Sequence, residues 1–314
     1  MRLLRARLID LAFVLFGVSI ITFLMIRLIP GDAVAIMLGA NAEVTPERME
    51  ALRASMGLDQ PILTQYFHWL SAILHGDLGL SLWTRRPVAE EILGHAWPTI
   101  ELSALALAMG AGLAIPFGVM MAWLRGRGWD VVLQIGSVAG LTIPSFWLGI
   151  MMILALTTLA PELQMLGYVP FGEDPIGNIT RLILPAFALS LPILANLARL
   201  VRSAMLDALQ QDYIRTARAK GVVERMVFFK HALRNALIPF VTSVGIMTGY
   251  LLGGAIVVEQ VFAIPGLGRL ILGAIAERNY PLIQASILVI TTAFVAVNVV
   301  VDLLYAVIDP RVRS

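Results

Sequence analysis

Six long apolar stretches, with their charged residues near the ends, divide this chain of 314 residues. A helix needs about 20 residues to cross about 30 Å of hydrocarbon, and each stretch reaches that length. We expect helices, because isolated strands would leave backbone groups unpaired in lipid and closed barrels show short alternating segments. The predicted spans are residues 8–29, 99–124, 131–160, 182–201, 236–258 and 282–308.

The composition agrees with this pattern. Hydrophobic residues make up 59% of the chain, charged residues make up 14%, and the mean hydropathy is +0.84. So little polar surface cannot cover a soluble globule of this length. The predicted fold class is therefore an all-α integral membrane protein with six transmembrane helices.

The first apolar stretch has a second interpretation. Three arginines precede it and Ala33, Val34 and Ala35 follow it, which imitates a cleavable signal peptide. The apolar run is longer than the usual core of a signal peptide, so a retained helix is favoured. Cleavage would leave five spans and place the chain ends on opposite sides of the membrane.

Arginine and lysine predict the orientation, because cytoplasmic ends and short loops carry an excess of both. With the N-terminus inside, the outer short loops hold only Arg181, Arg269 and Arg278, and the long first outer loop adds a few arginines. Both termini are thus predicted to be cytoplasmic. The cytoplasmic residues would be Arg2, Arg5, Arg7, Arg125, Arg127, Arg202, Arg215, Arg218, Lys220, Arg225, Lys230, Arg234, Arg311 and Arg313.

The first outer loop, residues 30–98, is expected to be a small folded unit. Thr45 and Pro46 can begin a helix over residues 47–56, and residues 65–74 predict a second, amphipathic helix. The run from Gly76 to Gly79 then predicts a turn. The loop either touches an extracytoplasmic partner or merely covers the helix ends, and the sequence favours neither.

His68 and His75 lie seven residues apart, a spacing that could present two imidazoles to a metal ion. No carboxylate or cysteine joins them at ligand spacing. We therefore interpret both as structural histidines and predict no metal site.

The spans carry almost no ionisable residues, and this weakens one class of function. Ion-coupled carriers usually hold acidic or histidine side chains at mid-membrane, whereas Glu101 and Asp302 lie near span ends. Proline is a second feature of the spans, because it removes a backbone hydrogen bond and can bend a helix. These prolines are Pro116, Pro144, Pro185 and Pro192.

The polar segment 203–235 interrupts the apolar pattern most strongly. Residues 204–220 favour a helix, Gly221 can end it in a left-handed conformation, and residues 222–236 can form a second helix. If these basic residues served only to orient the chain in the membrane, a few arginines would be enough. We therefore interpret this ordered basic segment as a docking surface for a soluble partner.

At this segment the chain resembles the inner-membrane permeases of binding-protein-dependent ABC importers. Their loop carries Glu-Ala-Ala, three residues and then Gly; here Arg215 replaces the glutamate and Gly221 closes the pattern. The spacing to Pro239, the run from Arg27 to Asp32 and the later run from Val261 to Gly268 are similar to B-type subunits of the dipeptide, oligopeptide and nickel family.

The resemblance implies a type I importer permease in a bacterial inner membrane. It implies a homologous second permease, two ATP-binding subunits, an extracytoplasmic solute-binding protein and surrounding lipid as partners, with no nucleic acid. The implied organisation is a cytoplasmic N-terminus and first span (1–29), an extracytoplasmic domain (30–98), a permease core (99–309) with the coupling loop 203–235, and a cytoplasmic tail (310–314).

Two sets of site residues follow. The outer loop 259–281 contains a Pro-Gly turn, and it either closes the pathway or contacts the solute donor, although a plain connector remains open. The expected ATPase-coupling residues are Arg215, Thr216, Ala217, Arg218, Ala219, Lys220 and Gly221, and the outer-loop candidates are Glu259, Phe262, Pro265 and Gly266.

No catalytic residue and no cofactor are predicted. The only lysines, Lys220 and Lys230, do not follow a glycine, so the chain contains no Gly-Lys-Ser/Thr end of a phosphate-binding loop. ATP hydrolysis is therefore expected in separate subunits. An ion-coupled secondary transporter and a non-transporting scaffold remain as alternatives, and the solute could be a peptide, a nickel chelate, glutathione or a glycan.

Overall fold

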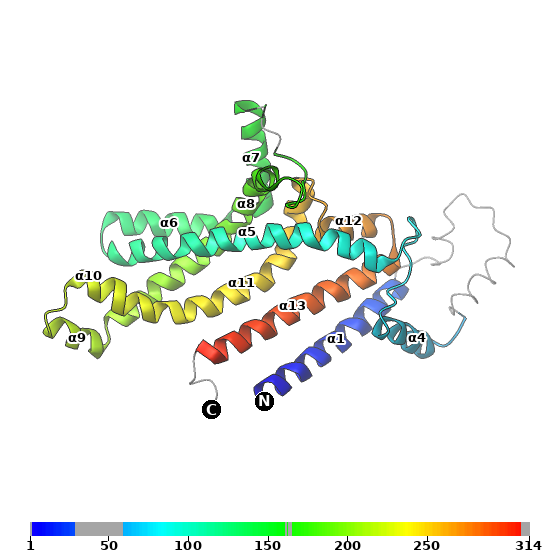
Figure 1. Ribbon diagram of the computed structural model, residues 1–314, viewed down its shortest axis with the longest axis horizontal. Helices are drawn as coiled ribbons and strands as arrows, with labels where there is room; N and C mark the ends of the chain where they lie inside the picture. The colour runs from blue at the N-terminus through cyan, green and yellow to red at the C-terminus, as the bar shows by residue number, and fades with distance from the viewer. Residues whose placement is uncertain (1, 29–58, 161, 163–164, 309–314) are drawn as a thin grey trace. The chain divides into compact units, whose positions relative to one another are not determined.

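The computed structural model describes residues 2–28, 59–160, 162 and 165–308, and within them the chain is helical, with one isolated bridge between Leu80 and Pro87 and no strand (Figure 1). The elements are α1 (Arg2–Leu28), α4 (Ile62–Leu74), α5 (Val88–Trp123), α6 (Gly128–Thr142), α7 (Ser145–Leu159), α8 (Pro175–Leu209), α9 (Asp212–Ala219), α10 (Glu224–Met226), the π-helix η1 (Val227–Ala232), α11 (Leu233–Val261), α12 (Leu267–Ala276) and α13 (Tyr280–Ile308).

The described residues contain three helices that are long and apolar enough to cross a membrane, or up to five if each bent pair counts as one span. The three are α5, α8 and residues 280–301 of α13. The apolar part of α1, Ile9–Met25, is shorter. This makes the chain a multi-pass membrane protein, and the described parts of all six predicted spans lie almost wholly in helices.

The predicted span 131–160 is not one continuous helix. It consists of α6 and α7, which meet at an angle of 98°. The break lies at Ile143, whose ψ of 119° is extended, and at Pro144. A proline ring clashes with an α-helical residue before it, so Ile143 leaves the helical conformation and the chain changes direction.

The described residues fall into two compact units, and the first comprises those of 1–96 and 270–293. Here the predicted helix 65–74 is confirmed as part of α4, and Tyr66 of α4 shares a hydrogen bond of 2.8 Å with Ser19 of α1. Gly76 and Gly79 have positive φ angles, as the predicted turn requires. The predicted helix 47–56 lies outside the described residues.

The two histidines of the first unit both have exposed side chains. His68 lies on α4 and His75 caps its C-terminus, where Nδ1 of His75 lies 2.7 Å from the carbonyl oxygen of Ser71. In the described part of the chain, no group of three metal-ligating side chains comes together.

The second unit comprises 97–269 and the described residues of 294–308, and α8 is its central helix. α8 packs against α6, α7 and α11, and fourteen of its residues are buried. Glycines of α5 allow close approach: a Cβ at Gly118 would come within 2.6 Å of the carbonyl oxygen of Ala198 on α8. This packing supports the two loops that flank α11.

Candidate functional site

The segment between α8 and α11 forms a short helix, a glycine turn and a second helical stretch. We call residues 212–226 the elbow. The predicted helix 204–220 is interrupted, because α8 ends at Leu209 and α9 begins at Asp212. The predicted second helix begins at Glu224 and continues through η1 into α11. The elbow is therefore continuous with a membrane helix at its C-terminal end.

Gly221 ends α9 as the sequence predicts. Its φ is +76°, a left-handed conformation that disfavours a side chain. The Gly221 N–H donates to the carbonyl oxygen of Arg218 at 2.9 Å, and the Val222 N–H donates to that of Ala217 at 3.2 Å. This pair of hydrogen bonds is a Schellman motif, which satisfies the last carbonyls of α9 and sets the direction of the next segment.

A few apolar contacts attach the elbow to the second unit. Ile214 is the buried residue of α9, with 0% of its surface exposed. Just beyond the elbow, Phe228 of η1 is buried against Trp123 of α5, with ring centroids 4.8 Å apart in an edge-on arrangement. Asn235 donates to the hydroxyl of Tyr213 at 2.5 Å. These contacts thus anchor the elbow where it joins α8 and η1, and the turn around Gly221 stays exposed.

An ion pair closes the turn. The Arg218 guanidinium donates to both carboxylate oxygens of Glu224, at 3.0 and 2.5 Å. These hydrogen bonds lower the pKa of Glu224 and raise that of Arg218. Both side chains are about half exposed, so water and salt screen the interaction. A second pair, Arg215 and Asp212, lies 3.4 Å apart in full solvent contact.

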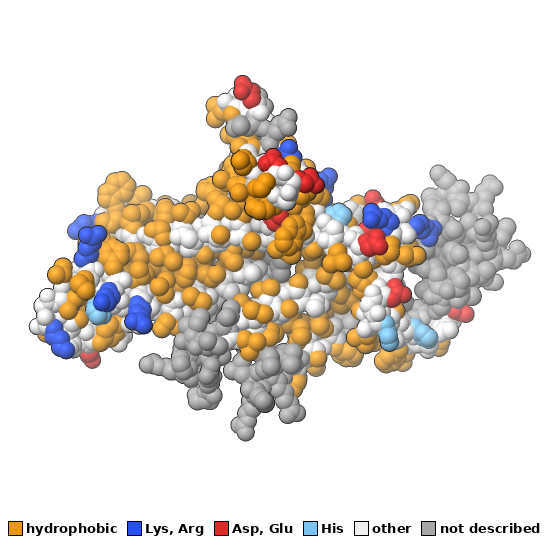
Figure 2. Space-filling model, in the orientation of Figure 1, with side chains coloured by type: hydrophobic (Ala, Val, Ile, Leu, Met, Phe, Trp, Pro, Cys, Tyr) orange, Lys and Arg blue, Asp and Glu red, His pale blue; other side chains and the backbone are white. Residues whose placement is uncertain are grey.

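The predicted coupling residues form one accessible surface. Six of the seven are exposed and Ala217 is half-buried. Figure 2 shows lysine and arginine side chains gathered at this end of the second unit, with hydrophobic surface along its helices. Three apolar side chains also project here: Val223 (67% exposed), Met226 and Phe229. Sequence reasoning missed them, because hydrophobic residues beside a span resemble the span itself.

The outer-loop candidates have a different environment. Glu259, near the end of α11, is fully buried. Its carboxylate accepts hydrogen bonds from the hydroxyl of Thr99 (2.6 Å) and from the backbone N–H groups of Gly268 (2.8 Å) and Arg269 (3.2 Å). The Thr99 hydroxyl also accepts from the N–H of Leu267 at 2.8 Å. We call Thr99, Glu259 and the first residues of α12 the outer lock.

The neighbouring candidates are also enclosed. Phe262 is fully buried, and a Cβ on Gly149 would come within 2.7 Å of its ring. Gly266 is buried beside the Glu259 carboxylate, where a side chain would overlap it, whereas Pro265 is half-buried. The accessible side chains of this loop are those of Ala263 and Arg269. Glu259, Phe262 and Gly266 therefore shape the loop from inside.

Another carboxylate, Glu101, is half-buried on α5. It accepts hydrogen bonds from the hydroxyl of Tyr168 (2.9 Å) and the side-chain amide of Asn178 (2.8 Å). Burial and the Glu101 carboxylate raise the pKa of Tyr168 to about 12. Glu101 thus holds the loop between α7 and α8 to α5, as a structural contact at the end of a span.

The chain matches two known protein families. A family described as the binding-protein-dependent transport system inner membrane component matches residues 114–314, and the N-terminal family of the same membrane components matches residues 1–99. The chain belongs to this permease family. The resemblance to ABC-importer permeases of the peptide branch is therefore confirmed.

Relatives of this permease align over nearly their whole length. A putative peptide transport system permease protein of Brucella abortus is 43% identical over 300 residues, covering 96% of this chain and 95% of the relative. The dipeptide transport system permease protein of Escherichia coli is 39% identical, covering 95% and 94%. The glutathione transport system permease protein of Escherichia coli is 41% identical, covering 98% and 97%.

Family membership assigns the chain to transport. The permease is a membrane component of a transport system and not its catalytic part. The elbow lies within the matched region 114–314, and so do the α11–α12 loop and Glu259. Thr99, the remaining side chain of the outer lock, is the last residue of the N-terminal match.

Proposed function

We propose that this permease forms half of the membrane pathway of an ABC importer and couples to separate ATP-binding subunits through the elbow. One observation carries the proposal: the elbow presents Arg215, Thr216, Arg218, Ala219, Lys220 and Gly221 at a basic end of the second unit. A surface of charged side chains and exposed apolar ones suits a soluble protein partner.

The proposed topology has six spans and both termini in the cytoplasm. In it α1 and α13 each span the membrane, and the bent pair α6–α7 makes up one span with a pronounced break. Residues 30–98 form an extracytoplasmic domain, residues 99–309 form the core, and residues 310–314 form a cytoplasmic tail. The proposed location is the bacterial inner membrane, and the words 'inner membrane component' in the family description support it.

The proposed partners are a homologous second permease, two ATP-binding subunits and an extracytoplasmic solute-binding protein. The proposed solute is a peptide or a peptide-like molecule. This choice rests on relatives that are named for peptide, dipeptide and glutathione transport and that are 39–43% identical to this chain.

In the proposed mechanism, closure of the ATP-binding subunits moves the elbow, and α8 and α11 reorient between inward- and outward-open states. Residues 215–221 face the ATP-binding subunits, and Gly221 fixes the turn. The outer-loop residues Glu259, Phe262, Pro265 and Gly266 act as a gate element, because they hold the start of α12 in place from within.

Crosslinking tests the docking surface directly. The chain has no cysteine, so a single introduced thiol is unique. Thr216→Cys in the assembled complex is expected to crosslink to an ATP-binding subunit in intact cells. Ser71→Cys, exposed on α4, is the matched control and is expected to give no such product. If Thr216→Cys never captures an ATP-binding subunit, the elbow is not the coupling surface.

Reconstitution tests the transport class. Uptake of a labelled dipeptide into vesicles is expected only when both permeases, the ATP-binding subunits, the binding protein and ATP are present. Uptake driven by an ion gradient without the ATP-binding subunits would instead show an ion-coupled carrier. The absence of flux under every condition would favour a scaffold.

A further inference from the structure

The C-terminal half of α8 exposes a row of polar side chains. α8 is the most buried of the three long apolar helices, yet it leaves Asn196, Arg199, Ser203 and Asp207 exposed. These residues are three or four positions apart, so they lie along one stripe of the helix. An amide and a guanidinium on a membrane helix are costly against lipid tails. Asn196 and Arg199, which lie within the predicted span 182–201, therefore face water or a polar occupant, and Ser203 and Asp207 continue the stripe into the polar segment 203–235.

The two arginines of this region differ in charge compensation. Arg202 donates to both carboxylate oxygens of Asp130, at 3.1 and 2.9 Å, and this pair is largely buried. Arg199, almost one turn earlier on α8, has no carboxylate partner within the described residues. Among the described residues, one arginine is thus neutralised by an ion pair, and the other carries a positive charge that no carboxylate compensates.

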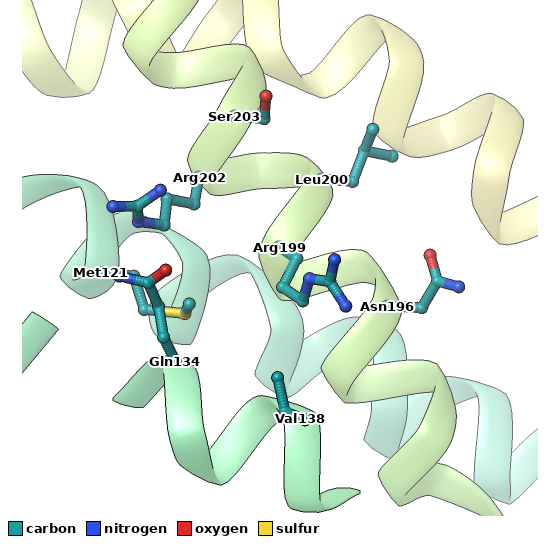
Figure 3. Close-up of a pocket in the computed structure, with 8 residues that line it drawn as sticks. All are labelled: Met121, Gln134, Val138, Asn196, Arg199, Leu200, Arg202 and Ser203. Atoms are coloured by element: carbon teal, nitrogen blue, oxygen red, sulfur yellow. The ribbon is translucent and has the colours of Figure 1, made fainter. Parts of the chain in front are cut away.

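Arg199 lies beside an open pocket of about 520 Å³ between α5, α6 and α8. Figure 3 shows Arg199 and Asn196 on α8, with Gln134 and Val138 on α6 across from them. Gln134 is positioned by a hydrogen bond of 2.9 Å to Asp130. The lining also includes Ser203, so the same pocket carries amide and hydroxyl side chains besides the guanidinium. The volume lies within the range of sites for small molecules.

We propose that this pocket, the Arg199 pocket, is an anion-binding subsite on the wall of the solute path and receives a carboxylate of the passing solute. The proposal rests on the proposed transport function and deepens it. A planar guanidinium can donate two parallel hydrogen bonds to a carboxylate. Asn196 and Ser203 can donate to the same group. The subsite thus binds the C-terminal carboxylate of a peptide and does not select among peptide side chains.

The surrounding surface argues against a lipid headgroup as the occupant. The outward side of α6 exposes Val132 and Ile135, apolar residues that suit lipid tails. The polar stripe follows α8 instead, from Asn196 to Asp207, which is about 16 Å of helix. The phosphate of a lipid headgroup would need only one cationic side chain to bind it. A solute path needs a continuous polar face, and α8 presents one.

Thiol labelling in nanodiscs tests the pocket, using the complex with its partner subunits. Ser203→Cys is expected to react faster with an anionic methanethiosulfonate than with a cationic one. Adding Arg199→Gln should lower that rate ratio about fivefold, and Arg199→Lys should largely preserve it. An unchanged ratio would overturn the proposal. Ile135→Cys, on the apolar face, is the control and should resist both reagents.

Protection identifies the occupant. Dialanine is expected to slow the labelling of Ser203→Cys. Dialaninamide lacks the carboxylate and is expected to leave the labelling rate unchanged. In the Arg199→Gln background, the two compounds should have the same effect on the labelling rate. Equal protection by both compounds, or by neither, would overturn the carboxylate assignment. Protection by phosphatidylglycerol in place of phosphatidylcholine would show a lipid site and overturn it too. Labelling needs no ATP hydrolysis, so a failed subsite is distinguishable from failed coupling to ATP-binding subunits.

Discussion

The elbow and the outer lock are loops at opposite ends of α11, and they use charged residues in opposite ways. In the elbow, the Arg218–Glu224 pair is about half exposed and only Ile214 of α9 is buried. In the outer lock, Glu259 is fully buried and accepts three hydrogen bonds from its own chain. The elbow leaves its charged side chains accessible to a partner, whereas the outer lock satisfies its carboxylate with hydrogen bonds from within the chain.

This contrast in burial indicates the role of a loop next to a membrane helix. Both loops contain glycine and charged residues. The sequence predicts a docking surface for the elbow, whereas for the outer loop it leaves pathway closure, contact with the solute donor and a plain connector open. A carboxylate whose hydrogen bonds are satisfied internally determines a conformation, whereas half-exposed ion pairs leave a surface that a partner can bind. Burial of the charged group, and not its presence, distinguishes the two roles.

The largest expected effect comes from removing the carboxylate of the outer lock. Glu259→Ala removes the carboxylate that accepts three buried hydrogen bonds, one from the Thr99 hydroxyl and two from backbone N–H groups. We expect the free energy of unfolding to fall by about 3 kcal/mol, measured as a lower melting temperature of the purified permease. Glu277→Ala removes an exposed carboxylate and should change little. Equal melting temperatures for both variants would show that the lock does not stabilise the fold.

A change in the elbow should affect coupling more than stability. Gly221→Trp places a large side chain on the docking surface at a φ of +76°, with backbone strain of about 1–2 kcal/mol. We expect uptake to fall at least about tenfold while the protein still inserts and ATP hydrolysis continues. Gly221→Asn tolerates this conformation and should keep most of the uptake. Normal uptake by the tryptophan variant would contradict the coupling role of Gly221.

The smallest expected effect is that of the Arg218–Glu224 pair. Its net contribution should be at most about 1 kcal/mol, because both groups are about half exposed. The pKa of Glu224 is lowered in the fold, so the contribution is present above the ordinary value of 4.5 and is lost as pH falls through the lowered pKa. The protection of the α9 amides from hydrogen exchange, relative to their intrinsic exchange rates at each pH, should then fall, and Glu224→Gln should remove that pH dependence.

The long apolar helices could be predicted from the sequence because apolar length indicates them, whereas α12 (Leu267–Ala276), inside the outer loop 259–281, was not predicted. The left-handed end of α9 at Gly221 was predictable from local glycine chemistry. The angle between α6 and α7 was not, although Pro144 marked its place, since the packing of both helices determines the direction after a break. The interruption at Gln210 and Gln211 carried no proline or glycine signal.

The environment of the site residues required the structure. Glu259 and Thr99 are separated by 160 positions, so no local pattern links them. For the same reason, charge alone could not distinguish the buried Glu259 from the exposed Lys220. The apolar side chains at the elbow, Val223 and Met226, and the adjacent Phe229 of η1 could be identified as exposed only from the structure, which shows that the neighbouring helices leave them uncovered.

The helical path from Glu224 to Val261 has a mechanical consequence. It runs through η1 and α11 without a loop, and its one bend of 53° lies near Gly253. At 1.5 Å per residue such a rod is longer than a bilayer core is thick. Under the proposed topology, a displacement of the elbow would therefore be transmitted along this helix to Glu259 and, through its hydrogen bond, to Thr99.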